Sequence, residues 1–263
     1  MTPEYLGEVA EADARGRLAE LYAEIRAVLG LPFVNLVYRH LAVDEERLAA
    51  VWAALGPNLA SQAAADAAQR LVAAAAPPAV EPLPAGIVGA GEATLARATL
   101  DAYARGNSRN LLGMHALLDG CPGTNDRRPA PAPPAPRPIL PMAALERLPE
   151  GPRALLDDMA VLVVGSDEPI LVPSLLRHFV HNAPLLALLH DRLVAHAAEL
   201  AMRREAVAAE ARRLAADLPV RVEPLESEQL RTMATRFAGA TSSLLVAGET
   251  MVAALELPRR GAG

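Results

Sequence analysis

The sequence has no lysine and only one cysteine, so all 25 of its positive charges are arginines. A single cysteine excludes an intrachain disulfide, a cysteine-based metal site and a paired-cysteine redox centre within one chain. We attribute the missing lysine to coding bias, because nothing in the sequence supports a functional reason for it.

Two further absences bear on location and partners. The longest uninterrupted apolar run, Leu48 to Leu55, has eight residues, whereas a membrane span needs ~20. The first sixteen residues carry four acidic side chains, not the basic start and apolar stretch of a signal peptide. The net charge of -6 gives no global attraction to nucleic acid. We therefore expect a soluble, cytoplasmic protein without a membrane or nucleic-acid partner.

Helix-forming residues dominate what is present. Alanine supplies 56 of the 263 residues, hydrophobic residues make up 52%, and aromatics only 3%. Leu18, Leu21, Ile25 and Leu29 recur at steps of three and four, as one face of a helix requires, and Gly30 is a suitable stop. The fold class predicted from these patterns is all-α.

Similar spacing predicts the other helices, and Asp44 is the expected N-cap of one of them. In the first half, the polar stretch around Gly106 separates two of the predicted helices. The later predicted helices span Thr94–Arg105, Ser108–Leu118, 152–164, 173–181, 184–216, 226–238 and 240–255.

A proline-rich stretch divides the chain. Seven of the fifteen residues from Arg127 to Pro141 are proline, which favours an extended, semi-rigid spacer over helix or sheet. The predicted organisation is an N-terminal helical repeat at 1–126, a linker at 127–141 and a C-terminal helical repeat at 142–263. Recognition by a proline-binding module is a weaker alternative for the linker.

The two halves share a pattern at a nearly constant offset. Tyr38-Arg39-His40-Leu41-Ala42 and Leu176-Arg177-His178-Phe179-Val180 lie 138 residues apart. Val80-Glu81-Pro82-Leu83 recurs as Val222-Glu223-Pro224-Leu225. Matches in the same order indicate a duplicated helical unit. We therefore predict two related helical bundles that form an intramolecular pseudo-dimer.

The generic motifs of catalysis are weak or absent. The stretch from Gly86 to Gly91 lacks the spacing and the following Gly-Lys-Ser/Thr of a phosphate loop. His178 and His181 could share a helix face, but no carboxylate lies one turn from either, so a polar or core role is favoured. We predict no metal site and no cofactor.

Two polar groups are candidates for a binding site. Arg39-His40 and Arg177-His178 sit among apolar neighbours, where a buried arginine needs an anionic partner. That partner is either a ligand in a shared cavity or a carboxylate within the same half. The amide of Asn107 either caps a following helix or points into a pocket, and the two roles are compatible.

Several short motifs, in order, resemble a known family. The motifs are a Leu-x-x-x-Tyr-x-x-Ile-Arg helix, a Leu-Pro-Phe turn, a Gly-Asn pair before two leucines, and three elements of the second half. They stand here at Leu18–Arg26, Leu31–Phe33, Gly106–Leu112, Val172–Ser174, Asn182–Pro184 and Met233–Phe237. This order resembles the group I 2-haloacid dehalogenases, or halocarboxylic acid dehydrogenase-like proteins, within the wider alkylhydroperoxidase-like helical superfamily.

The resemblance implies a pocket between the halves that binds a short 2-halocarboxylic acid. In that family an aspartate activates a water that displaces the halide, so the implied activity is that of a hydrolase. Phe33 would line the pocket, Asn107 would position substrate or water, and Asn110 would fall where the family has an aromatic residue. The peroxidases of the superfamily use a CxxC pair, which a chain with Cys121 alone cannot supply.

The catalytic position departs from the family pattern. The expected aspartate falls on Leu176, which cannot accept a proton, and an expected tyrosine falls on Ala234. A Ser-Asp pair exists at Ser166-Asp167, about nine residues away. The base could instead be His178 or His40, with Arg39 or Arg177 holding the carboxylate.

These departures leave three hypotheses for function. The first is a 2-haloacid dehalogenase-like enzyme that hydrolyses the carbon–halogen bond of a small 2-halocarboxylic acid. The second is a helical protein of the same fold that binds a small anion without turnover. The third is a structural protein with a fully packed interior. The expected partner is a small carboxylic acid, and a homodimer remains open.

Overall fold

Helices form the architecture of the residues described by the computed structural model, which are 7–77, 79–84, 86–164 and 172–255. Within these ranges there is no β-strand, only isolated bridges between Ser61 and Pro129 and between Cys121 and Val222. The all-α prediction is therefore confirmed. The α-helices are α1 (Gly16–Leu29), α2 (Leu36–Leu41), α3 (Glu45–Leu59), α4 (Gln62–Ala75), α5 (Ala90–Asp119), α6 (Glu150–Val164), α7 (Ser174–Arg177), α8 (Ala183–Ala195), α9 (Ala197–Ala215) and α10 (Glu228–Ala254).

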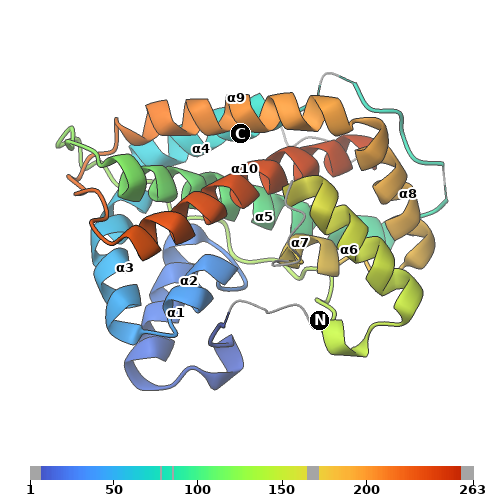
Figure 1. The fold of residues 1–263 in the computed structure, drawn as a ribbon, viewed down its shortest axis with the longest axis horizontal. Helices are drawn as coiled ribbons and strands as arrows, with labels where there is room; N and C mark the ends of the chain where they lie inside the picture. Colours follow the sequence, from blue (N-terminus) through green and yellow to red (C-terminus); the bar gives the residue numbers. More distant parts are fainter. Residues whose placement is uncertain (1–6, 78, 85, 165–171, 256–263) are drawn as a thin grey trace.

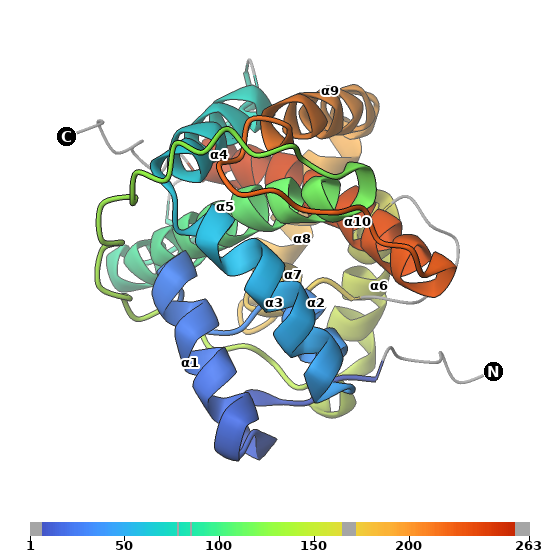
Figure 2. The same ribbon diagram turned by 90° about the vertical axis from the view of Figure 1, so that its left-hand side faces the viewer.

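The helices stack in layers around two long central ones. Helices α5 and α10 cross the middle of the molecule, and α4 and α9 lie side by side above them in both views (Figures 1 and 2). Helices α1 to α3 lie beneath one end of the central pair, and α6 to α8 lie at the other end (Figure 1). Each half of the chain thus supplies one central helix, one upper helix and a group of shorter helices.

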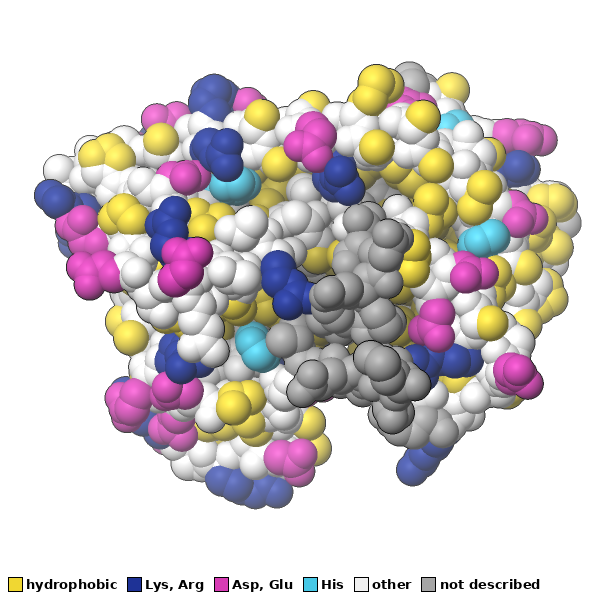
Figure 3. All heavy atoms as spheres, viewed as in Figure 1, with side chains coloured by type: hydrophobic (Ala, Val, Ile, Leu, Met, Phe, Trp, Pro, Cys, Tyr) yellow, Lys and Arg dark blue, Asp and Glu magenta, His cyan; other side chains and the backbone are white. Residues whose placement is uncertain are grey.

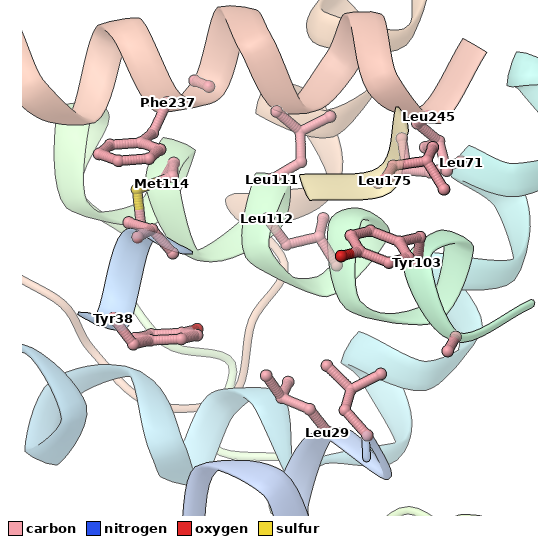
Figure 4. Packing of buried hydrophobic residues seen from close by; sticks show 14 of the residues in the cluster. Leu29, Tyr38, Leu71, Tyr103, Leu111, Leu112, Met114, Leu175, Phe237 and Leu245 are labelled. Carbon is pink, nitrogen blue, oxygen red and sulfur yellow. The ribbon is translucent and has the colours of Figure 1, made fainter. Parts of the chain in front are cut away.

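The core runs along the contact between α5 and α10. Phe237 and Leu245 of α10 point toward α5, which presents Leu111, Leu112 and Met114 in return (Figure 4). These three α5 side chains are fully buried. Burying each such side chain contributes roughly 1.5–3 kcal/mol relative to leaving it in water, so this contact is a main source of cohesion between the halves.

Local signals end and begin several helices where the sequence predicts. Gly30 follows α1 in the left-handed conformation, with φ at 65°, a backbone state that glycine adopts without strain. Asp44 caps α3, because its carboxylate accepts a hydrogen bond of 3.1 Å from the backbone N–H of Arg47. Both predictions are confirmed.

The predicted breaks around Gly106 and Gly239 are wrong. The segments expected as two helices in each half are single helices, α5 and α10. Asn107 and Ser108 therefore do not cap a helix; the Ser108 hydroxyl donates to the carbonyl of Arg105 within α5. The predicted helix 184–216 is instead interrupted at His196, between α8 and α9. Packing between the long helices outweighs the weak helix preference of glycine, serine and asparagine.

The two halves exchange equivalent backbone hydrogen bonds. The repeated Val-Glu-Pro-Leu motif ends in Leu83 in one half and Leu225 in the other. The N–H of Leu83 donates to the carbonyl of Ala254 near the end of α10, and the N–H of Leu225 donates to that of Leu117 near the end of α5, both at 2.8 Å. Each motif thus satisfies a terminal carbonyl of the other half's central helix. The pseudo-dimer stays a prediction, and these reciprocal contacts agree with it.

The helix starts of the two halves also match the predicted offset. Helices α2 and α7, α3 and α8, and α5 and α10 each begin 138 residues apart. The N-cap residues Asp44 and Asn182 occupy equivalent positions, and each accepts a hydrogen bond from the backbone N–H three residues on. The shared pattern therefore extends from the sequence to the ends of the elements.

The proline-rich segment contacts both halves, the second of them through the carbonyl of Leu140, which lies 2.6 Å from His178 Nδ1. Near its start, the carbonyl of Arg128 accepts from the N–H of Gln62, and the N–H of Ala130 donates to the carbonyl of Ala60. Near its end, the N–H of Leu140 donates to the Thr99 hydroxyl, and the Leu140 side chain is buried. The segment contains no helix, and its end is packed into the interior.

Helix α10 is long and apolar enough to cross a membrane by length and composition alone. In the structure 72% of its most apolar window is buried, because the helix packs against α5, α9 and α6. A mostly buried core helix passes the same test of length and composition.

Two helical glycines provide a test of this packing. A Cβ at Gly106 of α5 would lie 2.9 Å from Leu31 Cδ1 and 3.2 Å from both polar atoms of the Asn35 amide, whereas Gly239 of α10 has open space. Overpacking costs 1–3 kcal/mol and helical alanine gains up to about 1 kcal/mol over glycine. We expect Gly106→Ala to lower the free energy of unfolding by about 1 kcal/mol, and Gly239→Ala to raise it by about 0.5–1 kcal/mol. Urea denaturation measures both, and stabilisation by Gly106→Ala would contradict the close approach.

Candidate functional site

A cavity of about 320 Å³ lies where the two halves and the end of the linker meet. Its walls come from the Phe33–Asn35 turn and α2, the middle of α5, the linker end from Ile139 to Met142, the start of α7 with His178, and α10. The wall is mainly apolar, with a small number of polar side chains. Small-molecule sites typically have this composition.

Five of the predicted site residues line this cavity. They come from four different segments of the chain, and the sequence places them up to 145 positions apart. They are Phe33, Arg39, Asn107, Asn110 and His178. Their predicted roles toward a ligand stay predictions, but the structure does bring these side chains together.

Two other candidates lie outside the cavity lining. The Arg177 guanidinium donates from Nε and Nη2 to the carbonyl of Ala143, at 2.9 and 2.7 Å. The His40 ring lies 2.7 Å from the carbonyl of Gly7 through Nδ1, and its centroid is 5.9 Å from that of Phe237. Both side chains are turned toward backbone carbonyls elsewhere, so neither is positioned to contact a ligand in this cavity. The repeated Arg-His pairs thus contribute one arginine and one histidine, each from a different half.

Arg39 is a buried cation with one carboxylate partner. Its side chain is 8% exposed, and Nη2 lies 3.2 Å from Glu8 Oε2. The pairing within its own half, one of the two alternatives from the sequence, is therefore present. Nε of the same guanidinium is buried and has no hydrogen-bond partner. A buried donor without a partner costs free energy, so this edge of Arg39 is suited to a further acceptor.

The three asparagines that line the cavity differ in their hydrogen bonding. The Asn110 amide oxygen accepts a 2.9 Å hydrogen bond from the Tyr38 hydroxyl. Asn107 Nδ2 and Asn35 Oδ1 are buried and have no partner. Asn35 precedes α2 at the N-cap position, yet its side chain does not cap the helix. The cavity wall thus holds one unpaired amide donor and one unpaired amide acceptor.

His178 has a defined tautomer. Its Nδ1 lies 2.6 Å from the carbonyl oxygen of Leu140, which only accepts hydrogen bonds, so Nδ1 carries the proton. Burial lowers the pKa of His178 to about 4 from its ordinary 6.5, and the ring is therefore neutral at pH 7. Nε2 then has a free lone pair and accepts from the Tyr103 hydroxyl at 3.2 Å.

Aromatic side chains complete the wall beside this pair. The Phe33 and Tyr103 rings are 4.7 Å apart, and the Tyr103 and His178 rings meet edge to face at 5.5 Å. Phe237 of α10 adds a further aromatic ring to the cavity lining. Burial raises the pKa of the Tyr103 hydroxyl above its ordinary value, so it stays protonated at neutral pH.

Sequence reasoning missed several lining residues, of which Tyr103 is the most informative. Tyr103, Asn107 and Asn110 follow the i, i+4, i+7 spacing of one helix face, which a continuous α5 would have revealed. Ser174 and His178 are likewise four residues apart. The assumed break at Gly106 concealed the first pattern.

The position expected for the family's base is not at the cavity. Leu176 of α7 is fully buried and does not line it, whereas Ser174, two residues earlier, does. The alternative pair Ser166-Asp167 lies outside the described residues. Ala234, where the family tyrosine was expected, is buried away from the lining, and Phe237 of the same helix provides an aromatic ring there.

Within the described ranges, no three side chains of His, Cys, Asp or Glu gather as metal ligands would. Cys121 is buried, and its Sγ donates to the carbonyl of Val220. The charged groups of the cavity wall are the Arg39 guanidinium and the Glu11 carboxylate, and the carboxylate already pairs with Arg26 and accepts from the N–H of Val34.

Comparison with known proteins shows the fold. No protein-family model and no curated protein sequence matches this chain. Solved structures do: D-2-haloacid dehalogenase in complex with L-LA has a TM-score of 0.79 at 17% identity. A D-2-haloacid dehalogenase mutant with D-2-CPA has a TM-score of 0.78 at 15% identity. Each comparison covers 96% of both chains, so the protein has the fold of the D-2-haloacid dehalogenases.

The low pKa of His178 predicts a pH-dependent stability. Between pH 6.5 and 4, the unfolded chain binds a proton on this ring and the folded chain does not, so stability is lost as the pH falls. The loss amounts to at most about 3 kcal/mol. We expect the difference in free energy of unfolding between wild type and His178→Gln to shrink by this amount from pH 7 to pH 4. Denaturant titrations across this range measure it.

A His178→Gln difference that stays constant from pH 7 to pH 4 would contradict the buried, neutral ring.

Proposed function

We propose that this dehalogenase-like protein binds a small carboxylic acid in the cavity between its halves. The observation that carries the proposal is the pair of buried, unpartnered donors in the lining, Arg39 Nε and Asn107 Nδ2. A carboxylate supplies the acceptors that both donors lack. The shared fold with D-2-haloacid dehalogenases supports the same class of ligand.

Arginine and amide together suit a carboxylate better than either does alone. A guanidinium binds carboxylate oxygens with charge-assisted hydrogen bonds, which are about twice as strong as neutral ones. Arg39 already faces Glu8, and that carboxylate is one-third exposed. The ligand would therefore share the guanidinium with Glu8, and Nε is the guanidinium atom that lacks a partner.

The apolar part of the wall suits the rest of such an acid. Phe33, Leu140, Phe237 and Leu244 line the cavity and offer surface to an alkyl chain or a halogen. Water is displaced from these side chains when an apolar group enters, which favours binding at about 25 cal/mol per Å² buried. A volume of about 320 Å³ restricts the ligand to small molecules.

Hydrolysis of a 2-halocarboxylic acid is the second candidate function, and the Tyr103–His178 pair favours it. The water oxygen would bond to C2 while the carbon–halogen bond breaks and the halide leaves with the bonding electrons. The water proton would pass to the Tyr103 oxygen as the Tyr103 proton moves to His178 Nε2, the acceptor that it already contacts. The products are a 2-hydroxy acid, a halide and a proton.

The low pKa of His178 makes hydrolysis a less well supported function than binding. A general base works best when its pKa lies near the working pH, and burial holds this one at about 4. At pH 7 such a base is about a thousandfold less readily protonated than one with a pKa of 7. Leu176 supplies no alternative proton acceptor. Hydrolysis by this route would therefore be slow.

The remaining expectations belong to the same proposal. A soluble protein that binds a small acid needs neither a membrane nor a nucleic-acid partner, and we propose a cytoplasmic location and no cofactor. On the face shown in Figure 3, arginines and acidic side chains are interspersed, without a large patch of one sign. A homodimer remains a proposal for solution measurements.

Removing the donors should weaken acid binding. We expect Arg39→Gln to raise the Kd for 2-chloropropionate roughly 10- to 100-fold, because a hydrogen bond to a charged group is worth about 1.5–3 kcal/mol. Asn107→Ala should raise it about tenfold or less. Isothermal titration calorimetry measures both. Arg177→Gln is the control, since its guanidinium is turned to Ala143, and an equal loss there would contradict the assignment to Arg39.

Halide release separates turnover from binding. If the water proton passes through Tyr103 to His178, wild type releases chloride from 2-chloropropionate slowly. Tyr103→Phe and His178→Gln should then each reduce the rate at least ~100-fold, the usual contribution of acid–base catalysis. Their Kd for this acid should remain within about twofold, since neither residue is a proposed carboxylate donor. Acid binding without any chloride release would contradict hydrolysis and leave the binding function standing.

A further inference from the structure

We propose that the cavity selects a carboxylic acid with a hydrogen-bond donor beside the carboxylate, a 2-hydroxy acid, over the corresponding 2-halo acid. This inference rests on the proposed binding of a carboxylate at Arg39 and Asn107. It concerns the other side of the site, where the lining presents acceptors rather than donors. Two independent acceptors, from Tyr103 and Asn35, carry it.

The first acceptor is the Tyr103 oxygen. Leu140 holds the proton of His178 on Nδ1, which leaves Nε2 as an acceptor. The Tyr103 hydroxyl must therefore direct its only proton toward Nε2, and it has none left for a ligand. The hydrogen bond from Ser174 lowers the pKa of Tyr103, as a donor to the phenolic oxygen does, so it occupies one of the two lone pairs of that oxygen. The Tyr103 oxygen therefore offers a ligand one remaining lone pair and no proton.

The second acceptor is Asn35 Oδ1. The side chain is 7% exposed, lines the cavity and leaves this oxygen without a hydrogen-bond partner. Gly106 of α5 lies close to the Asn35 amide, since a Cβ there would be 3.2 Å from both of its polar atoms.

Other helix N-caps in the chain use their side chains differently. Asp44, Ser61, Asn182 and Ser227 each accept a hydrogen bond from the helix that they precede. Asn35 occupies the same position before α2 and forms no such bond. Its amide is therefore available to the cavity instead of the helix.

A halogen cannot satisfy either acceptor. Carbon-bound chlorine or bromine has no proton to donate, so a 2-halo acid leaves Asn35 Oδ1 buried and unpaired and the remaining lone pair of Tyr103 without a donor. A hydroxyl on C2 has one proton and can therefore donate to one acceptor. That acceptor is the Tyr103 oxygen or, after a small rotation of its amide, Asn35 Oδ1. Sites built to bond a hydroxyl reject analogues that lack it far more strongly than apolar pockets reject an added one.

Titration with three acids of similar size tests this selectivity. Calorimetry of the wild-type protein with D- and L-lactate, 2-chloropropionate and propionate gives the affinities directly. We expect the better lactate enantiomer to bind at least about tenfold more tightly than 2-chloropropionate and propionate, since an unsatisfied buried polar group costs roughly 1–3 kcal/mol, or 5- to 150-fold.

Variants assign the preference to the two acceptors. Asn35→Ala and Tyr103→Phe should each reduce the lactate-to-chloropropionate ratio at least about threefold, while the Kd for 2-chloropropionate changes less than twofold. Either variant is sufficient for the test if the other fails to fold. Thr250→Val is the matched control, because it removes a buried hydroxyl that donates to the carbonyl of Val246 and does not line the cavity, and it should leave the ratio unchanged.

The outcomes separate this inference from the proposed function. If none of the acids binds, the carboxylate site itself is wrong. If the acids bind but 2-chloropropionate binds as tightly as lactate, the selectivity is wrong and the carboxylate site stands. A tenfold preference that survives in both Asn35→Ala and Tyr103→Phe would overturn the assignment to these residues.

Discussion

The packing of α5 against α10 is the contact on which the rest of the structure depends. These helices come from different halves of the chain, and their apolar faces form the centre of the core. Because the reciprocal bonds from Leu83 and Leu225 tie each helix end to the opposite half, the halves cannot separate without exposing both. The cavity lies beside this packing, where polar side chains of α5 such as Asn107 and Asn110 join the wall.

The helical class and the likeness between the halves were predictable from the sequence. Both follow from its periodicity and composition and do not depend on tertiary contacts. The ends of α1 and α3 were predictable for the same reason, since Gly30 and Asp44 act locally. The continuity of α5 was not, because Gly106 and Asn107 are poor helix formers alone. They are retained in the helix since Leu31 and Asn35 pack against the space that Gly106 leaves. Arg177 and His40 could not be told apart from Arg39 and His178 by sequence, because the repeat gives both pairs the same pattern. In the structure, Arg177 bonds to the carbonyl of Ala143 and His40 to that of Gly7, so neither lines the cavity.

The chemistry of the cavity differs from what a motif comparison implies. A leucine at the expected base position suggested a lost function, yet Leu176 belongs to the core, and the polar groups of the site come from Arg39, Asn107, Tyr103 and His178. The linker has a direct part in this arrangement, because the carbonyl of Leu140 sets the His178 tautomer. The lining offers hydrogen-bond donors from Arg39 and Asn107 and acceptors from Tyr103 and Asn35. A ligand with a carboxylate and a neighbouring hydroxyl would bond to both kinds of group.

A crystal structure of the protein soaked with lactate tests the central claim most directly. The account predicts one molecule in the cavity, with a carboxylate oxygen within about 3 Å of Arg39 Nε and Asn107 Nδ2. It predicts the 2-hydroxyl within the same distance of the Tyr103 oxygen or Asn35 Oδ1. A lactate bound with its carboxylate away from Arg39, or a cavity that stays filled only with water at saturating lactate, would contradict it.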